Sequence, residues 1–203
     1  MKYPNTYITE KFKIRKSNKP SYKYFPKSKK ELRDILKQLI EQRGYDGDFN
    51  DIDTSEITDM SELFYNMTEF NGDISNWDVS KVTNMHDMFD SCYKFNKPLN
   101  YWDVSNVTYM AYMFRACESF NGDISGWDVS NVTNMRYMFY YCISFNQDIS
   151  GWNVSNVTNM KYMFCFCESF NQDISNWNVS NVKYNQGIFD NCPIEEKHKP
   201  KFN

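Results

Sequence analysis

The chain has 203 residues, of which 41% are hydrophobic and 18% aromatic, and its formal net charge is −3. This apolar content is enough for a core, and 7 Gly and 6 Pro are too few for a collagen-like or low-complexity disordered chain. No apolar run has the length of a signal peptide or of a membrane span, so we expect a soluble protein that stays in the cytoplasm.

The start of the chain is basic. Residues 1–43 carry 13 Lys and Arg against 4 Asp and Glu, whereas the remainder carries 10 against 22. We expect residues 1–24 to form a basic, flexible leader. Binding to an anionic partner is one interpretation of this charge, and a solvated leader beside an acidic remainder is the simpler one. The pattern does not favour nucleic acid as the partner.

A capping helix is predicted over residues 25–44. Ser28 and Glu31 have the spacing of a capping box, and Gly44 supplies the end of the helix. Its apolar residues fall on one helical face: Leu32, Ile35, Leu36, Leu39 and Ile40. Because this segment leads directly into a repeated region, we expect it to cover the first repeat.

From Tyr45 onwards the sequence repeats every 25 residues without an insertion. The six copies are 45–69, 70–94, 95–119, 120–144, 145–169 and 170–192, followed by a tail at 193–203. The tryptophans all occupy the eighth position of a copy: Trp77, Trp102, Trp127, Trp152 and Trp177. Such a period indicates stacked units in which identical side chains lie on one another.

Each copy is predicted to contain a short strand and a short helix. Apolar and polar residues alternate around Trp77 and Val79, which is typical of a strand. The next apolar residues have the spacing of a helical face: Val82, Met85, Met88, Phe89 and Cys92. The predicted fold is therefore an α/β repeat solenoid, a leucine-rich-repeat-like arc of six strand-helix units with concave strands, convex helices and an N-terminal capping helix.

The phrase FNGDISGWDVSNVTNMRYMF at residues 120–139 resembles the 25-residue repeats of the BspA-like leucine-rich-repeat surface proteins, a family that includes mycoplasma lipoprotein-associated repeats. The resemblance covers about residues 25–192. It implies a non-catalytic module that binds a partner protein, and it gives the cell surface as the alternative location.

The concave face of the arc is the first predicted binding surface. Its residues are the ninth position of each copy together with one tyrosine: Asp53, Asp78, Asp103, Asp128, Asn153, Asn178 and Tyr101. Carboxylates about 5 Å apart repel one another, so a basic partner or a cation would stabilise them, and a solvated face is the other interpretation. A linear row does not supply converging oxygens for Ca²⁺, and no metal site is predicted.

The convex face is the second predicted surface. It carries aromatic side chains outside the apolar columns: Tyr112, Tyr137, Tyr162, Tyr140, Tyr141 and Phe166. Tyrosine suits interfaces because it is large, rigid and amphipathic. A structural or self-associating role through this face is the alternative to concave binding, and a simple covering of the helices is the third interpretation.

Three further columns are predicted to be structural. The column from Cys92 to Cys192 continues a buried face, which favours reduced packing thiols over a metal ladder or stacked disulfides. The asparagine column that begins at Asn71 is expected to bond turn backbone between neighbouring units. The serine column from Ser55 to Ser180 is expected to behave in the same way.

Catalysis finds little support in the sequence. The two histidines, His86 and His198, lie outside any motif with catalytic spacing. An active site needs several different groups at one place, whereas each column supplies one group repeatedly. We therefore predict no catalytic residues and no cofactor.

Overall fold

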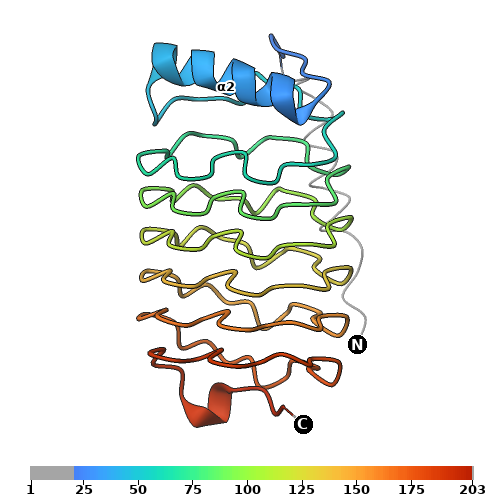
Figure 1. Ribbon diagram of the computed structural model, residues 1–203, viewed down its shortest axis with the longest axis vertical. Coiled ribbons are helices and arrows are strands. Elements are labelled where there is room, and N and C mark those ends of the chain that lie inside the picture. The colour runs from blue at the N-terminus through green and yellow to red at the C-terminus, as the bar shows by residue number, and fades with distance from the viewer. Residues whose placement is uncertain (1–20, 203) are drawn as a thin grey trace, which may run out of the picture.

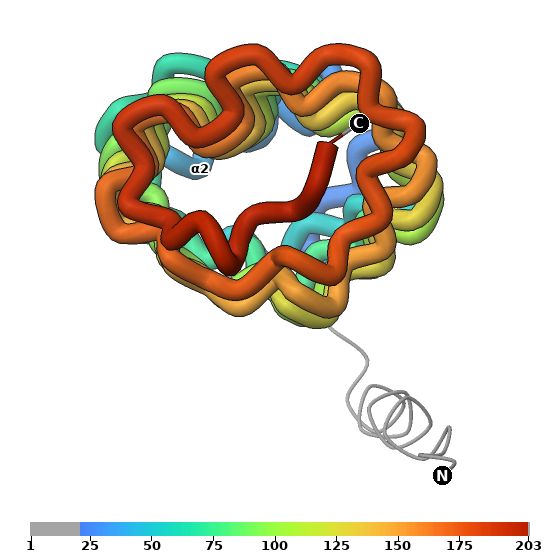
Figure 2. The backbone as a smooth tube through the Cα atoms, turned by 90° about the horizontal axis from the view of Figure 1, so that it is seen from below, coloured from blue at the N-terminus to red at the C-terminus, as the bar shows by residue number. Residues whose placement is uncertain are grey.

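The computed structural model describes residues 21–202, which form a tall stack of coils covered at one end by a helix (Figure 1). This helix, α2, spans Lys29–Arg43, and the other helix of the described residues is the short 3-10 helix η1, Glu196–His198. We number the coils 1 to 6, one for each of the six 25-residue copies. Seen along the stack, they superimpose as closed ovals (Figure 2). The predicted basic leader, residues 1–24, lies almost entirely outside the described residues.

α2 has the two cap residues that were predicted for it, although it begins at Lys29 and not at residue 25. Ser28 Oγ accepts a hydrogen bond from Glu31 N at 3.2 Å, and Gly44, with φ at 76°, donates its N–H to Ile40 O at 2.8 Å. The Glu31 carboxylate accepts from the backbone N–H of Lys27 instead of that of the N-cap residue. Leu32, Leu36 and Leu39 are buried, so α2 closes the apolar end of the stack.

The predicted α/β repeat solenoid of strand-helix units is wrong. Within residues 21–202, the six coils contain no helix, and strand pairing is limited to isolated bridges. One file of parallel bridges joins residues 25 apart: Asp59, Asn84, Tyr109, Asn134, Asn159 and Tyr184. The coils are built from turns and close into ovals, so the arc with a concave strand face and a convex helix face, and the leucine-rich-repeat description with it, do not apply.

Consecutive β-turns explain the apolar spacing that resembled a helix. The N–H groups of Met88, Cys92 and Phe95 each donate to the carbonyl three residues earlier, at 3.3, 3.0 and 3.1 Å. A turn returns residue i+3 to the side of residue i, so a spacing of three buries side chains without a helix. Asp87 and Ser91 have φ values of 54° and 62°, which interrupts helical geometry within each coil.

Backbone groups between these turns bond to the next coil. Asp87 N donates to Ala111 O at 3.1 Å, Phe89 N to Met113 O at 2.9 Å and Ser91 N to Arg115 O at 2.8 Å. The same set recurs in the following coils. These N–H groups would point along the axis of a helix, but here they join neighbouring coils, which explains why no helix forms.

The core confirms the predicted stacking of identical side chains. Phe114 lies on Phe139 with ring centroids 5.7 Å apart, and Trp127 lies on Trp152 at 6.3 Å. Each indole also donates its N–H to a carbonyl of the previous coil, as in Trp127 Nε1 to Leu99 O at 3.0 Å. Burial of these aromatic rings in one continuous cluster supplies most of the apolar driving force for folding.

The cysteine column lies inside this core, and the six cysteines are free thiols. Cys117 Sγ donates to Phe89 O at 2.9 Å, and Cys142 Sγ donates to Phe114 O at 2.8 Å. Burial raises the pKa of both thiols. A protonated thiol that fills a small apolar site is a packing group and a weak nucleophile.

The left-handed turn positions give a test of this coil geometry. Ala116 has φ at 56°, whereas Ala111 is buried and is not among the positive-φ residues. Ala116→Gly should raise the free energy of unfolding by about 1 kcal/mol, because glycine adopts positive φ without steric cost. Ala111→Gly should lower it by about 0.5–1 kcal/mol. Urea unfolding of the two variants measures both effects, and an equal loss in both would contradict the assigned turns.

Candidate interaction surface

The predicted concave row lies at one turn of each coil. Asp78 Oδ1 and Asp128 Oδ1 each accept a hydrogen bond at 3.0 Å from the backbone N–H two residues later, and Asn153 Oδ1 does so at 3.2 Å. The same bond is made by the remaining members: Asp53, Asp103 and Asn178. This Asx-turn geometry gives the row a structural role that was not predicted from the sequence.

The Asp/Asn row does not lie on a concave face, because the coils close into ovals and have none. Its side chains are exposed or half-buried beside the turns that they stabilise. Tyr101, predicted with them, is 50% exposed on the same side of coil 3. Partner contact through this row stays a prediction that the geometry does not favour.

Two more columns use the same Asx-turn and were missed. At the fourth position Asp123 Oδ1 accepts from Ser125 N at 3.0 Å, and at the fifteenth Asn134 Oδ1 accepts from Arg136 N at 3.1 Å. Coils 1, 2, 4 and 5 are therefore fixed at three turns by a short polar side chain, whereas coil 3, with Pro98 and Tyr109 at the fourth and fifteenth positions, has only the bond of Asp103. The Asp-x-Ser spacing at the fourth to sixth and ninth to eleventh positions was the available signal.

The asparagine column forms the predicted ladder between coils. Asn71 Oδ1 accepts from Asn96 N at 3.0 Å, and Asn96 Oδ1 accepts from Asn121 N at 2.8 Å. The ladder continues to Asn171 Oδ1, which accepts from Glu195 N at 2.9 Å in the tail. These amides lie at the surface and hold the edges of successive coils together.

The six predicted convex-face residues form one contiguous cluster on coils 3 to 5. Tyr137 stacks between Tyr112 and Tyr162, with ring centroids at 4.9 and 5.0 Å. Tyr140 lies 5.4 Å from Tyr137 and 5.9 Å from Phe166, and the Tyr141 ring is 5.6 Å from the same phenylalanine. We call these six side chains the aromatic cluster. They project from turns and not from helices.

Two cations without an acidic partner lie on this cluster. The Arg136 guanidinium is 4.7 Å from the Tyr112 ring centroid, and Lys161 Nζ is 5.5 Å from that of Tyr162. Arg136 Nη2 also donates to the Tyr112 hydroxyl. Among residues 21–202 no carboxylate is paired with either cation, and the buried Arg136 Nε has no hydrogen-bond partner.

A polar pocket of about 340 Å³ lies beside the aromatic cluster, between coils 1 and 4. The buried Asp90 carboxylate pairs with Arg115 Nη2 at 2.7 Å, and Asp87 pairs with His86 Nε2 at 2.9 Å. Burial, with the nearby Asp90 charge adding to it, raises the pKa of Asp87 to about 6 despite this His86 contact. The pocket was not predicted from the sequence, because its members come from different positions of four successive coils.

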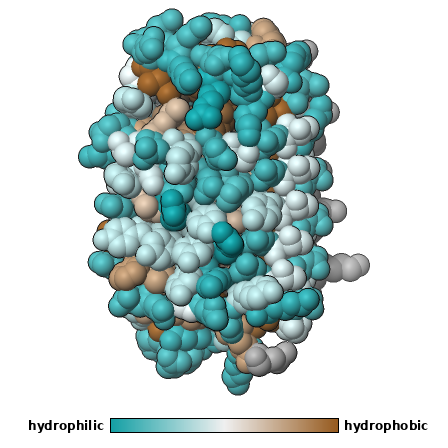
Figure 3. All heavy atoms as spheres, in the orientation of Figure 1, coloured by the Kyte–Doolittle hydropathy of each residue, from teal (hydrophilic) through white to brown (hydrophobic). Residues whose placement is uncertain are grey.

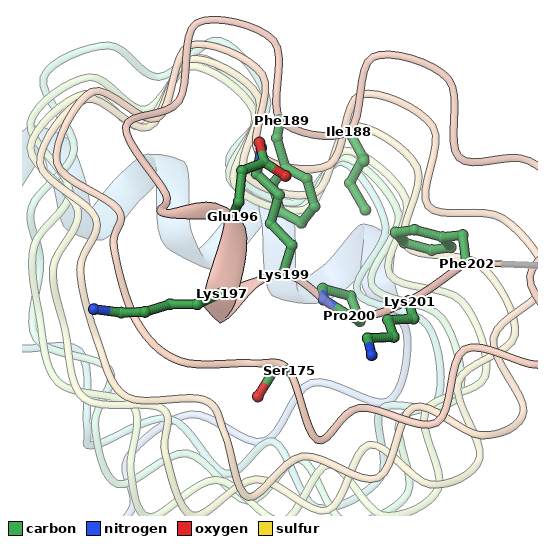
Figure 4. A pocket seen from close by; sticks show the side chains of 9 residues that line it. All are labelled: Ser175, Ile188, Phe189, Glu196, Lys197, Lys199, Pro200, Lys201 and Phe202. Atoms are coloured by element: carbon green, nitrogen blue, oxygen red, sulfur yellow. The ribbon is translucent and has the colours of Figure 1, made fainter.

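A second pocket, of about 400 Å³, lies where the tail crosses the open end of coil 6 (Figures 2 and 4). Ile188, Phe189 and Phe202 line its apolar side, while Lys197 points away (Figure 4). Lys199 Nζ lies 5.6 Å from the Phe189 ring centroid. Since Phe189 and Phe202 pack against the core cluster, this pocket is a gap under the C-terminal cap.

The outer surface offers no large apolar area on the long face shown in Figure 3, where hydrophilic and intermediate side chains dominate. The apolar columns of the sequence point inward, so the exposed aromatic side chains are mainly tyrosines. The large hydrophobic side chains exposed in residues 21–202 are Phe25, Tyr45, Tyr65, Tyr93, Tyr101, Tyr141 and Tyr184.

Comparison with known proteins gives a family for this architecture. Residues 33–135 and 119–199 match the family described as Mycoplasma protein of unknown function, DUF285. The chain belongs to this family. No curated protein and no solved structure matches the DUF285 chain. Among its described residues, no helix is long and apolar enough to cross a membrane, and no group of three or more His, Cys, Asp or Glu is placed to hold a metal ion.

The Asx-turns predict which substitutions of the aspartate row are tolerated. Asp128→Ala removes the acceptor for Ser130 N and should lower the free energy of unfolding by about 1 kcal/mol. Asp128→Asn should be nearly neutral, because Asn153 makes the same bond one coil later. Thermal unfolding compares the two variants, and equal stabilities would show that the side-chain bond contributes nothing.

The raised pKa of Asp87 predicts a dependence of stability on pH. The folded carboxyl holds its proton up to about pH 6, whereas an ordinary aspartate loses it near 3.8. Its contribution to stability is therefore complete below about pH 4 and is lost as the pH rises through 6. The Asp87→Asn variant has no ionisable group at this position. Its free energy of unfolding relative to wild type should therefore rise by about 1 kcal/mol between pH 4 and pH 7, a value reduced for partial exposure.

Urea unfolding at pH 4, 5, 6 and 7 measures this difference. Glu41→Gln is the control, because Glu41 is an exposed carboxylate of α2 that lies outside the polar pocket. The control should follow the wild-type profile. Parallel profiles for Asp87→Asn and wild type would show that Asp87 is not the titrating group.

Proposed function

We propose that this DUF285 chain is a non-catalytic protein-binding module whose contact surface is the aromatic cluster. The observation that carries the proposal is the combination of six contiguous aromatic side chains with two cations that have no carboxylate partner among residues 21–202. Tyr and Arg are the residue types that dominate binding energy in protein interfaces.

The backbone beneath the cluster is well suited to such a role. Tyr112 N donates to Arg136 O and Tyr137 N donates to Lys161 O, both at 2.9 Å, so each turn is tied to the next coil. Tyrosine has only two rotatable side-chain bonds, and the rings already restrain one another by stacking. Little conformational entropy is then lost when a partner binds.

The repeat pattern supports a binding role over catalysis. The polar columns present Asp, Asn and Ser repeatedly, and these side chains bond their own turns. In the polar pocket, Asp90 is held by Arg115, and Asp87 is held by His86. The resemblance of residues 120–139 to the repeats of BspA-like surface proteins favours a protein partner, with the cell surface as the alternative to the cytoplasm.

Removal of two central rings tests the contact surface. Tyr137→Ser combined with Tyr162→Ser should lower capture of partner proteins from an extract of the native host at least tenfold, because interface tyrosines are common binding hot spots. Quantitative mass spectrometry of proteins retained by the immobilised chain measures the loss.

Tyr45→Ser is the matched control, since Tyr45 is 46% exposed and lies outside the aromatic cluster on coil 1. It should retain the same proteins as wild type. If the double variant also retains all of them, the aromatic cluster is not the contact surface.

A further inference from the structure

The charges on the face of the aromatic cluster are arranged by coil. The eighteenth residues of coils 1 to 5 form one file along the stack: Glu62, Asp87, Tyr112, Tyr137 and Tyr162. Backbone bonds join these turns in series: Glu62 N to His86 O at 2.8 Å, and Asp87 N to Ala111 O at 3.1 Å. The file therefore carries carboxylates on coils 1 and 2 and tyrosines on coils 3 to 5.

The cations occupy the neighbouring file at the other end. Arg136 belongs to coil 4 and Lys161 to coil 5, each directly before a tyrosine of the first file. Coil 3 lies between the two ends and has Ala111 at this position. The face is thus acidic on coils 1 and 2, aromatic on coils 3 to 5 and basic on coils 4 and 5, with the Arg136 guanidinium reaching back to Tyr112 on coil 3.

Other charges on this face are already paired or cancel. Lys29 Nζ pairs with Asp59 Oδ2 at 2.9 Å, and Arg115 Nη2 pairs with Asp90 Oδ2 at 2.7 Å. Coil 6 adds one exposed charge of each sign, Lys183 and Asp190. Within the two files, the charged groups are Glu62 and the His86-bound Asp87 on coils 1 and 2, and the two cations on coils 4 and 5.

A second copy of the chain matches this pattern when it is turned by 180° about an axis through coil 3. Coil 1 then opposes coil 5, and coil 2 opposes coil 4. Glu62 meets Lys161 of the second copy, Asp87 meets Arg136 of the second copy, and each pair occurs twice because the contact is isologous.

We infer that two copies of this chain associate antiparallel through this face, with the twofold axis at coil 3. The inference rests on the proposed function and names the partner as a second copy. Tyr112 lies at the axis and meets its own equivalent, while Tyr65 on coil 1 meets the aromatic side chains of coil 5. An unrelated acidic partner would use only the basic end and would leave Glu62 without a counter-charge.

Charge reversal at one pair tests both the association and its register. Wild type should have a mass of about 49 kDa by light scattering at micromolar concentration, twice the 24.3 kDa of one chain. Glu62→Lys and Lys161→Glu should each weaken association at least tenfold, because each places like charges together twice. An equimolar mixture of the two variants should restore the dimer, since both pairs in the mixed species are again opposite in charge.

Lys94→Glu is the control, because Lys94 is exposed, precedes coil 3 in the chain and is not in either charged file. It should leave the dimer intact. A wild-type monomer at every concentration overturns the inference, and so does a dimer that single reversals do not weaken or that the mixture does not restore. The capture experiment with Tyr137 and Tyr162 variants reads out the proposed function separately.

Discussion

The backbone hydrogen bonds between neighbouring coils are the constraint on which the structure depends. Alternate N–H groups within a coil, such as those of Asp87 and Phe89, point to carbonyls of the following coil. A fixed offset then places every side chain over its equivalent 25 residues away, as the file of bridges from Asp59 to Tyr184 shows. Identical rings must stack as a result.

The features that were predicted correctly from the sequence depend on repetition or on local caps. The stacking of the Trp and Phe columns needs only a constant period, and the ends of α2 need only Ser28 and Gly44. The internal form of a coil was predicted wrongly, because an apolar spacing of three is shared by helices and consecutive turns. The direction of the backbone hydrogen bonds distinguishes a helix from consecutive turns. The apolar spacing of Met85 and Met88 does not reveal where the N–H groups of the neighbouring residues point.

The candidate surface could be predicted in part for the same reason. The aromatic cluster was visible as a column of tyrosines, and the structure brings all six members together. The polar pocket with Asp87 and Arg115 was not visible, because it combines different positions from adjacent coils. The aspartate row was also visible and its binding role stays a prediction, whereas the Asx-turns made by Asp128 and its equivalents were not predicted.

The left-handed turns separate the inside of the molecule from the outside. Glu62, Asp87 and Tyr112 have the same backbone conformation with φ between 54° and 59°. The first side chain is long and acidic, the second is short and acidic, and the third is aromatic. The interior columns beside them keep Met or Leu, Phe, and Cys or Met. The side chains of this outer file can therefore be substituted one coil at a time without a change in the coil geometry. The protein can acquire a new binding preference while its scaffold stays unchanged.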